Sequence, residues 1–489
     1  MQIRKITKFI LGAICGSVVT LSVYGIANKI NEDDVKTVSI PVDDINNFAN
    51  VYAITKSYYV ESVTDTKLMN GAINGMLTNL DPHSEFLDQD SFKQLTEITT
   101  GSFGGLGIEV SHEKDNAIKV VAPIYDTPAY KAGVKSGDFI IKINGEPVSN
   151  MTLDQAVKKM RGKIGTKVTL TISRKSELKP IVLTIPRAKI EVASIKYTMI
   201  TPYYGYIRVT NFQANTVSDL IAALQNIYNT NPKLKGLILD LRDDPGGVLQ
   251  GAVGVAGAFL PKDSLIVYTL GRAPNSNQKY YAKPDDYTTE DDKPDLSKVP
   301  AIFKTIPMVV LINQGTASAS EIVSGALQDY KRAKIVGTRS FGKGSVQTVI
   351  PLSESTAVKL TTALYYTPKG RSIQAEGIKP NIIVQSEYDD LYNSWDISEA
   401  SLDNHLDNPN GTTVSKDKDN TPIITPPKQI SSESELKERV KQQLAKTPKV
   451  VKPNEATVDL NTDFQLKWAL NIIEGKPLPK QNIKSISNK

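Results

Sequence analysis

The chain has 489 residues, of which 40% are hydrophobic and 22% charged, and its formal net charge is +6. At this length we expect two to four folding units with ordinary globular cores, and so small a charge gives no reason to expect a nucleic-acid partner. Cys15 is the only cysteine, which excludes an intramolecular disulfide and a cysteine-rich metal site. His83, His112 and His405 are far apart in the sequence. No local zinc motif can be drawn from them, and we expect neither a metal nor a cofactor.

The first thirty residues predict a membrane anchor. Arg4, Lys5 and Lys8 precede an uncharged, mostly apolar run over residues 9–27, which is about the length of a helix that spans a bilayer. The basic flank predicts a cytoplasmic N-terminus. Gly25-Ile26-Ala27 resembles a signal-peptide cleavage site. We therefore expect a single-pass membrane protein whose remaining chain lies outside the cytoplasm, anchored or released by cleavage.

The next part of the chain changes from helical to strand-like. Residues 44–97 carry apolar positions at helical spacing, interrupted by the turn-like stretch "NLDPHSEFL". From residue 101 to residue 187 there are short β runs and one helical segment, "TLDQAVKKMRG". These runs predict a small, partly open barrel.

The stretch "GGLGIEV" lies at the start of this barrel. It is followed by "AGVKSGDFIIKINGEPV", and together they resemble a bacterial PDZ domain. A phosphate-binding loop is disfavoured because no P-loop lysine follows. The resemblance implies that an exposed strand edge pairs with a peptide C-terminus while backbone N–H groups take its carboxylate. The residues in question are Gly105, Leu106, Gly107 and Ile108.

Strand-like and helical runs then alternate from about residue 190 to residue 384, which predicts a core with helices packed on a sheet. The fold class is therefore multidomain α/β. Residues 389–453 are rich in polar residues and proline, which indicates a linker, and "TDFQLKWALNIIEG" predicts an amphipathic helix. The predicted divisions are an anchor (1–30), an N-terminal helical region (31–100), a PDZ domain (101–187), an α/β core (188–385), a low-complexity linker (386–455) and a C-terminal helix (456–489).

Three stretches of the core could carry chemistry, and the first is "LINQGTASASEIVSG". Ser318 and Glu321 have the spacing of a capping box at a helix N-terminus. The alternative is a nucleophile at the same place, where free N–H groups can stabilise an oxyanion. Taken alone, the stretch favours the cap.

The second stretch, "LILDLRDDPGG", joins an apolar strand to two glycines that allow backbone N–H groups to approach a ligand, although most such turns are ordinary. The third, "TRSFGKGSVQ", places Lys343 between glycines. A buried lysine has a lowered pKa and can act as a base, whereas most loop lysines are exposed. Ser340-x-x-Lys343 also has the spacing of penicillin-recognising enzymes, but Gly342 and Gly344 make the required helix improbable.

The order of these motifs, with the PDZ-like module before them and "LTTALYYTPKGRSIQAEGIKPNI" after them, resembles the carboxyl-terminal processing (tail-specific) serine proteases over about residues 58–384. The resemblance implies a serine endopeptidase that forms an acyl-enzyme with a Ser–Lys dyad. It implies Ser318 as nucleophile, Lys343 as general base and Gln347 as the residue that orients the lysine. The oxyanion hole would comprise the backbone N–H groups of Ala319 and of Gly246 or Gly247.

The sequence departs from the family pattern at few places. Thr316 stands where many relatives have serine, and Asp243-Asp244 precede the PGG turn where asparagine is common. Asp329 matches an acidic position of some relatives, and we retain it as a supporting residue. The runner-up interpretation is a non-catalytic PDZ scaffold at the membrane, and a third is a penicillin-binding acyltransferase that uses Ser340.

Three further expectations concern partners and control. Protein substrates with exposed C-termini should bind the PDZ-like module. The N-terminal helices and the apolar face of the last helix (Phe464, Trp468 and Ile472) should pack together and form a homodimer. A charge contact from Arg174 to the protease body should couple peptide binding to catalysis, although an exposed arginine is as common.

Overall fold

The computed structural model describes residues 41–112, 118–290, 292–386, 398–411, 421–426, 452 and 454–478. The predicted membrane anchor and its cleavage site lie outside these residues. Within the described part of the chain, no helix combines the length and apolar character that a membrane span requires.

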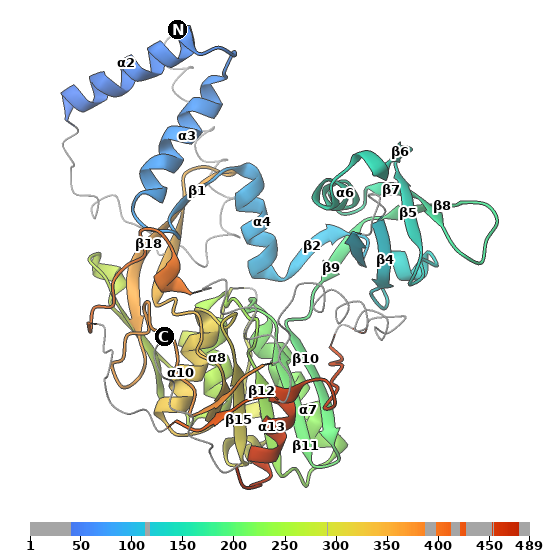
Figure 1. The fold of residues 1–489 in the computed structure, drawn as a ribbon, viewed down its shortest axis with the longest axis vertical. Helices are drawn as coiled ribbons and strands as arrows, with labels where there is room; N and C mark the ends of the chain where they lie inside the picture. Colours follow the sequence, from blue (N-terminus) through green and yellow to red (C-terminus); the bar gives the residue numbers. More distant parts are fainter. Residues whose placement is uncertain are drawn as a thin grey trace, which may run out of the picture.

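Three helices form the N-terminal region: α2 (Val42–Tyr58), α3 (Asp65–Thr78) and α4 (Gln89–Thr100). The side chain of Thr64 caps α3 and that of Asp88 caps α4. Helix α2 extends away from the body of the molecule, and none of its residues is buried (Figure 1). The stretch predicted to be a turn also contains a strand, β1 (Glu85–Leu87), which pairs antiparallel with β18 of the core. This pairing fastens the N-terminal region to the core.

The PDZ module is a sheet with strand order β3-β4-β5-β7-β8, so β3 is an edge strand. A two-stranded ribbon, β2 (Ser102–Gly105) with β9 (Ala188–Glu191), connects the module to the rest of the chain (Figure 1). The capping box Thr152–Gln155 begins helix α6. The elements are β3 (Ile108–His112), β4 (Ile118–Pro123), α5 (Pro128–Lys131), β5 (Phe139–Ile143), β6 (Glu146–Pro147), α6 (Leu153–Met160), β7 (Lys167–Ser173) and β8 (Ile181–Pro186).

The core is built on a seven-stranded sheet of order β10-β11-β12-β15-β16-β19-β20, parallel except for β10. Alternate residues of β12 face opposite sides, since Leu237 and Leu239 join one apolar cluster while Ile238 joins the other. Helices α7 (Thr216–Thr230), α8 (Leu249–Phe259) and α10 (Ala319–Asp329) cover the first side. The strands are β10 (Ile195–Thr201), β11 (Tyr204–Val209), β12 (Gly236–Asp240), β15 (Met308–Ile312), β16 (Lys334–Gly337), β19 (Ile382–Val384) and β20 (Ile423–Ile424). This architecture confirms the predicted α/β class.

A second sheet lies against the core. Its order is β1-β18-β13-β14, and β17 also pairs with β18. Its strands are β13 (Leu265–Leu270), β14 (Gln278–Tyr281), β17 (Ser345–Pro351) and β18 (Ala357–Tyr366), with the short helix α9 (Pro284–Tyr287) after β14. Because β17 begins directly after the Lys343 loop, this sheet fixes one end of that loop.

The C-terminal helix α13 (Phe464–Ile473) packs against β12, β15 and β16. Its apolar face, which includes Phe464, Trp468 and Ile472, joins the second apolar cluster of the core sheet. The expectation that this helix packs with the N-terminal helices is therefore wrong, because the core sheet presents an apolar face that the same helix covers. An ion pair fixes the start of α13: Arg242 contacts Asp463 at 2.7 Å and Asp240 at 2.6 Å.

Parts of the predicted linker also belong to the core. Strand β20 extends the seven-stranded sheet, and residues 398–411 pack beside the Lys343 loop. Glu399 and Asn408 of this segment are buried. A polar composition indicated a linker, but these two polar side chains have hydrogen-bond partners that compensate for their burial.

Candidate active site

The three motifs of the core meet at one edge of the sheet. Strands β12, β15 and β16 are parallel neighbours, and each motif directly follows the carboxyl end of one of them. Because parallel strands end at the same edge, the sequence-distant loops are brought together there.

Ser318 lies at the sharp turn between β15 and α10, with φ 53° and ψ −114°. A positive φ is uncommon for a residue with a side chain and occurs at exposed nucleophiles on strand-to-helix turns. Surrounding groups hold this conformation. The Ser318 N–H donates to the Glu321 carboxylate at 2.8 Å, the Ala317 N–H to the Asp244 carbonyl at 2.9 Å, and the Tyr365 hydroxyl to the Ser318 carbonyl at 3.0 Å.

The neighbouring hydroxyls have structural roles. Thr316 Oγ1 donates to the Leu241 carbonyl at 2.7 Å, and Ser320 Oγ donates to the Asp244 carbonyl at 3.1 Å. Both side chains are buried. They tie the Ser318 turn to the loop after β12.

Lys343 lies on the loop between β16 and β17, and its backbone is held at both ends. Its N–H donates to Glu321 at 3.0 Å, and its carbonyl accepts from Tyr365 at 2.8 Å. A Cβ on Gly344 would come within 2.7 Å of the Gln374 backbone nitrogen, so this glycine permits close packing rather than a helix. No hydrogen bond joins the Ser318 hydroxyl to the Lys343 amine in the described structure, as is common before substrate binds.

The surroundings of the Lys343 amine favour its neutral form. Burial, helped by the positive charge of Lys359, lowers the pKa of Lys343 to about 8. Glu399, Glu321 and Asp81 act in the opposite direction. A lysine with this pKa is partly neutral near physiological pH and can accept a proton.

Glu321 links the two loops, a role that sequence reasoning missed because the residue fits a capping box. Its carboxylate is fully buried and accepts the backbone N–H groups of Ser318, Gly342 and Lys343. It also accepts the hydroxyl of Ser340, the serine considered as an alternative nucleophile. Burial raises the pKa of Glu321 to about 7, although these hydrogen bonds act to lower the pKa.

Gln347, predicted to orient the lysine, has other partners in this structure. Its Nε2 donates to Ser345 Oγ at 3.0 Å and to Thr361 Oγ1 at 3.1 Å. Thr361 in turn donates to Asp81 at 3.0 Å. Gln347 is thus joined through Thr361 to the N-terminal turn at residues 81–84.

The predicted oxyanion donors lie beside Ser318. A Cβ on Gly246 would come within 2.8 Å of the Ala319 nitrogen and 2.9 Å of Ser318 Cβ. The Gly246 N–H is already engaged, however, because it donates to Asp244 Oδ1 at 2.9 Å. For the N–H groups of Ala319 and Gly247, the described part of the chain provides no acceptor.

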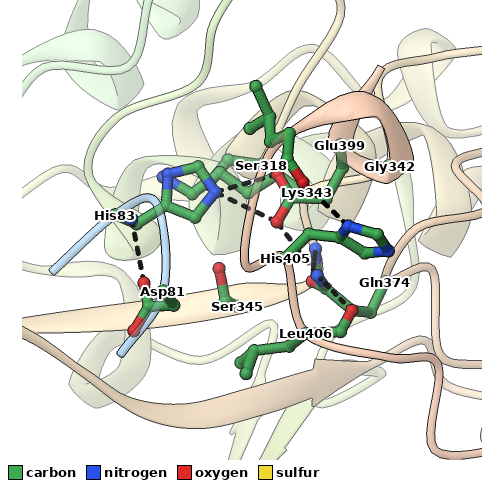
Figure 2. Close-up of polar contacts among 12 residues, drawn as sticks. Asp81, His83, Ser318, Gly342, Lys343, Ser345, Gln374, Glu399, His405 and Leu406 are labelled. Carbon is green, nitrogen blue, oxygen red and sulfur yellow. Dashed lines mark hydrogen bonds and ion pairs between the residues drawn. The ribbon is translucent and has the colours of Figure 1, made fainter. Parts of the chain in front are cut away.

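A second polar group, missed in the sequence, lies next to the lysine (Figure 2). His83 Nε2 is 2.8 and 3.1 Å from the two carboxylate oxygens of Glu399, and Gln374 Nε2 donates to Glu399 at 2.9 Å. Burial raises the pKa of Glu399, but hydrogen bonds from His83 and Gln374 outweigh it and hold this pKa below its ordinary value. Glu399 lies in a stretch of linker-like composition, so no sequence signal pointed to it.

Two other predicted residues lie elsewhere. Asp329 pairs with Arg371 at 2.6 Å and accepts the Lys369 N–H, which ties the end of α10 to the turn after β18. Arg174 pairs with Asp138 inside the PDZ module, at 2.7 Å. The predicted contact of Arg174 with the protease body is not present in this structure, because the nearer buried carboxylate takes its guanidinium.

The predicted peptide-binding residues span the start of edge strand β3. Gly107 has φ +78°, and a Cβ there would come within 2.3 Å of the Thr127 side chain. Only glycine fits this position without strain. The free edge of β3 can accept a peptide as an added strand.

Taken together, a serine on a strained turn and a neighbouring lysine of lowered pKa can carry out acyl transfer. Among the described residues, no group of three His, Cys, Asp or Glu side chains could hold a metal ion.

Comparisons with known proteins identify protease and PDZ regions in this chain. Residues 203–384 match the model of peptidase family S41, residues 95–173 match the PDZ domain, and residues 9–91 match the N-terminal domain of the activating protease CtpB.

Two curated proteases are similar to this chain over most of its length. The carboxy-terminal-processing protease of Bartonella bacilliformis is 45% identical over 409 residues, which cover 83% of this chain and 88% of that protein. The carboxy-terminal processing protease CtpA of Bacillus subtilis is 35% identical, with 78% and 77% covered. Among solved structures, the photosystem II D1 C-terminal processing protease is 26% identical over 71% of this chain and 94% of that one, with a TM-score of 0.39. The identity with the two curated proteases over most of both chains shows that the chain belongs to the carboxy-terminal processing proteases of peptidase family S41.

Proposed function

We propose that the chain is a serine endopeptidase in which Ser318 is the nucleophile and Lys343 the general base. One observation carries this proposal: the same buried carboxylate, that of Glu321, accepts the backbone N–H groups of both residues. The two loops are thereby held in one fixed relation. The lysine among them has a pKa lowered to about 8, which suits a base at physiological pH.

The reaction would proceed through an acyl-enzyme. Neutral Lys343 takes the proton of Ser318 Oγ as the oxygen attacks the scissile carbonyl carbon. The tetrahedral intermediate then collapses, and the leaving amine takes the proton from Lys343. In the second half, Lys343 takes a proton from water as the water oxygen attacks the ester carbonyl. The bond to Ser318 Oγ then breaks, Oγ takes the proton back from Lys343, and the product acid leaves.

The developing oxyanion would be held by the N–H groups of Ala319 and Gly247. Gly247 is favoured over Gly246 because the Gly246 N–H already donates to Asp244. Each preorganised donor of this kind is worth about 3–4 kcal/mol in the transition state.

Substrates would be proteins with exposed C-termini, captured by the PDZ module. The edge strand β3 would pair with the last residues of the substrate, and the backbone at Gly105, Leu106, Gly107 and Ile108 would take the carboxylate. A substrate with an amidated C-terminus should bind more weakly. Equal binding and cleavage of the amidated and free-acid forms would argue against this role of the module.

We further propose that the apolar run over residues 9–27 anchors the protein and that the protease body lies outside the cytoplasm. The support is the sequence alone: an uncharged run behind three basic residues. Membrane fractionation of the full chain and of a chain lacking residues 1–30 tests this, since only the former should sediment with membranes.

Homodimer formation also stays a proposal, now based on α2 alone. Its residues Val42, Phe48, Val51 and Ile54 are exposed in the single chain, and a second copy would cover them. Light scattering of the chain with and without residues 42–58 distinguishes a dimer from a monomer.

The experiment that tests the catalytic proposal is proteolysis of an unstructured protein such as casein, without added metal. Ser318→Ala and Lys343→Ala should each remove nearly all activity, because the two groups act as a unit. EDTA should have no effect. Wild-type activity in either variant would contradict the mechanism. No cleavage by the wild-type chain would instead favour the non-catalytic PDZ scaffold.

A further inference from the structure

Residues 398–411 lie beyond the stretch that matches peptidase family S41, yet they pack on the Lys343 loop. The Glu399 N–H donates to the Phe341 carbonyl at 3.0 Å. Gln374 Nε2 donates to the Leu406 carbonyl at 3.0 Å, and Asn408 Nδ2 donates to the Gln374 carbonyl at 2.8 Å. The segment is therefore bonded to the loop on one side and to the turn that begins at Gln374 on the other.

The Glu399 side chain continues this connection to the far side of the lysine. Gln374 Nε2 donates to its carboxylate, while Gln374 Oε1 accepts the Gly344 N–H at 2.9 Å. Phe341 and Gly344 flank Gly342 and Lys343. Glu399 is therefore bonded directly to the loop before the lysine, at Phe341, and through Gln374 to the loop after it, at Gly344. His83, from the N-terminal turn, also contacts this carboxylate: its Nε2 lies 2.8 Å from Glu399 Oε2 (Figure 2).

We propose that Glu399 is a positioning residue for Lys343, which it holds in place from a segment beyond the residues that match peptidase family S41. This inference rests on the proposed role of Lys343 as the base. Glu399 fixes the backbone of the lysine loop through Phe341 and Gln374, and its carboxylate adds a negative charge close to the amine.

The charge of Glu399 has a measurable consequence. The groups that act on the Lys343 amine are Lys359 of β18, Glu321 of α10, Asp81 of the N-terminal turn and Glu399 itself. His83 faces Glu399 from the same N-terminal turn. Because a nearby carboxylate favours the charged form of a lysine, its removal should lower the pKa of Lys343.

A merely structural glutamate would behave differently. If Glu399 only filled space, Glu399→Gln would change stability and leave the titration of Lys343 where it was. If Glu399 positions the lysine, Glu399→Gln should move that titration to lower pH by roughly one pH unit. It should also reduce kcat on the pH plateau about tenfold, because the neutral amide makes weaker hydrogen bonds to His83 and Gln374 and holds the lysine loop less firmly.

The test combines two measurements on the full chain. The first is competitive acetylation of Lys343 by acetic anhydride, followed by mass spectrometry across a pH series in the Ser318→Ala background. The rate follows the neutral fraction of the amine and requires no catalysis. The second is the pH profile of casein cleavage in the Ser318 form. Both compare Glu399→Gln with Asp403→Asn, which removes a carboxylate from an exposed position of the same segment.

The expected result is a lower titration midpoint in Glu399→Gln, an unchanged midpoint in Asp403→Asn and recovery of the wild-type midpoint in Glu399→Asp. Thermal unfolding of each variant confirms that it is folded. A wild-type midpoint and a wild-type plateau in Glu399→Gln would overturn the positioning role, even if Ser318→Ala abolishes cleavage. Full cleavage by Ser318→Ala would instead overturn the proposed function, which the acetylation measurement does not depend on.

Discussion

Asp244 accepts the backbone N–H of Gly246 at 2.9 Å, so the turn beside Ser318 is held by a carboxyl group that is fully buried. Its second oxygen, Oδ2, has no hydrogen-bond partner among the residues that the structure describes. Burial raises the pKa of Asp244 to about 8. The side chain is therefore mainly neutral at physiological pH.

This relationship predicts that Asp244→Asn stabilises the protein at alkaline pH. The folded-state pKa lies above the unfolded value of about 4, so the stability that protonated Asp244 gives is complete below pH 4 and is lost as the pH rises through about 8. Asparagine never ionises. We expect Asp244→Asn to raise Tm over the wild type by at least about 2 °C at pH 9, with a smaller difference at pH 5.

Asp243→Asn is the matched control for this prediction. Asp243 is the neighbouring carboxylate, and its side chain is 64% exposed. Its removal should give no gain that grows with pH. An equal gain in both variants would mean that net charge, rather than the burial of Asp244, sets the effect.

The pH dependence of cleavage follows from the lysine. The pKa of Lys343 is lowered to about 8, and only the neutral amine can take a proton. We therefore expect kcat/KM to rise with pH along a titration curve whose midpoint lies near pH 8. Lys343→Arg should be inactive at every pH, because arginine stays charged. A profile that is flat from pH 6 to 9, with chemistry rate-limiting, would exclude Lys343 as the base.

Tyr365 should matter to catalysis although it is buried below the reacting atoms. Its hydroxyl lies 3.0 Å from the Ser318 carbonyl and 2.8 Å from that of Lys343. Tyr365→Phe leaves these carbonyls without this donor, which should cost about 1–3 kcal/mol of stability and lower kcat more than it changes KM. The control is Tyr366→Phe, which removes the hydroxyl of the next residue along the strand. The ring of Tyr366 stacks on that of Tyr268. Steady-state kinetics in which Tyr365→Phe and Tyr366→Phe both match the wild type would contradict the prediction.

The sequence allowed the α/β class and the PDZ resemblance to be predicted because both depend on local periodicity and on ordered motifs. It could not place α13, because an apolar helical face has the same pattern whether it covers a helix or a sheet. The burial of Glu399 beside the lysine loop could not be predicted from the sequence for another reason. Its partner His83 is 316 positions away, and a single glutamate in a polar stretch carries no signal of burial.

Arg174 illustrates the same limit at the scale of one side chain. It follows β7, and the sequence could not tell whether it points to the protease body or back into its own module. In the structure its guanidinium donates to both carboxylate oxygens of Asp138, at 2.7 and 2.8 Å, and to the Gly133 carbonyl at 2.8 Å. The direction of the Arg174 side chain is set by Asp138, because this carboxylate is buried and needs a cation nearby.

This geometry predicts that Arg174→Ala acts on the PDZ module itself. The Asp138 carboxylate would lose its charged partner while buried, which should destabilise the module by roughly 3 kcal/mol. Binding of a free-acid apolar peptide should weaken together with cleavage of substrates that the module captures. Arg174→Lys keeps the charge but loses the paired hydrogen bonds, so it should fall between Ala and the wild type. Peptide affinity by fluorescence anisotropy, measured on the full chain with Ser318→Ala, checks this. If Arg174→Ala binds peptide with wild-type affinity and still loses cleavage, the arginine instead couples the module to the dyad, as the sequence first suggested.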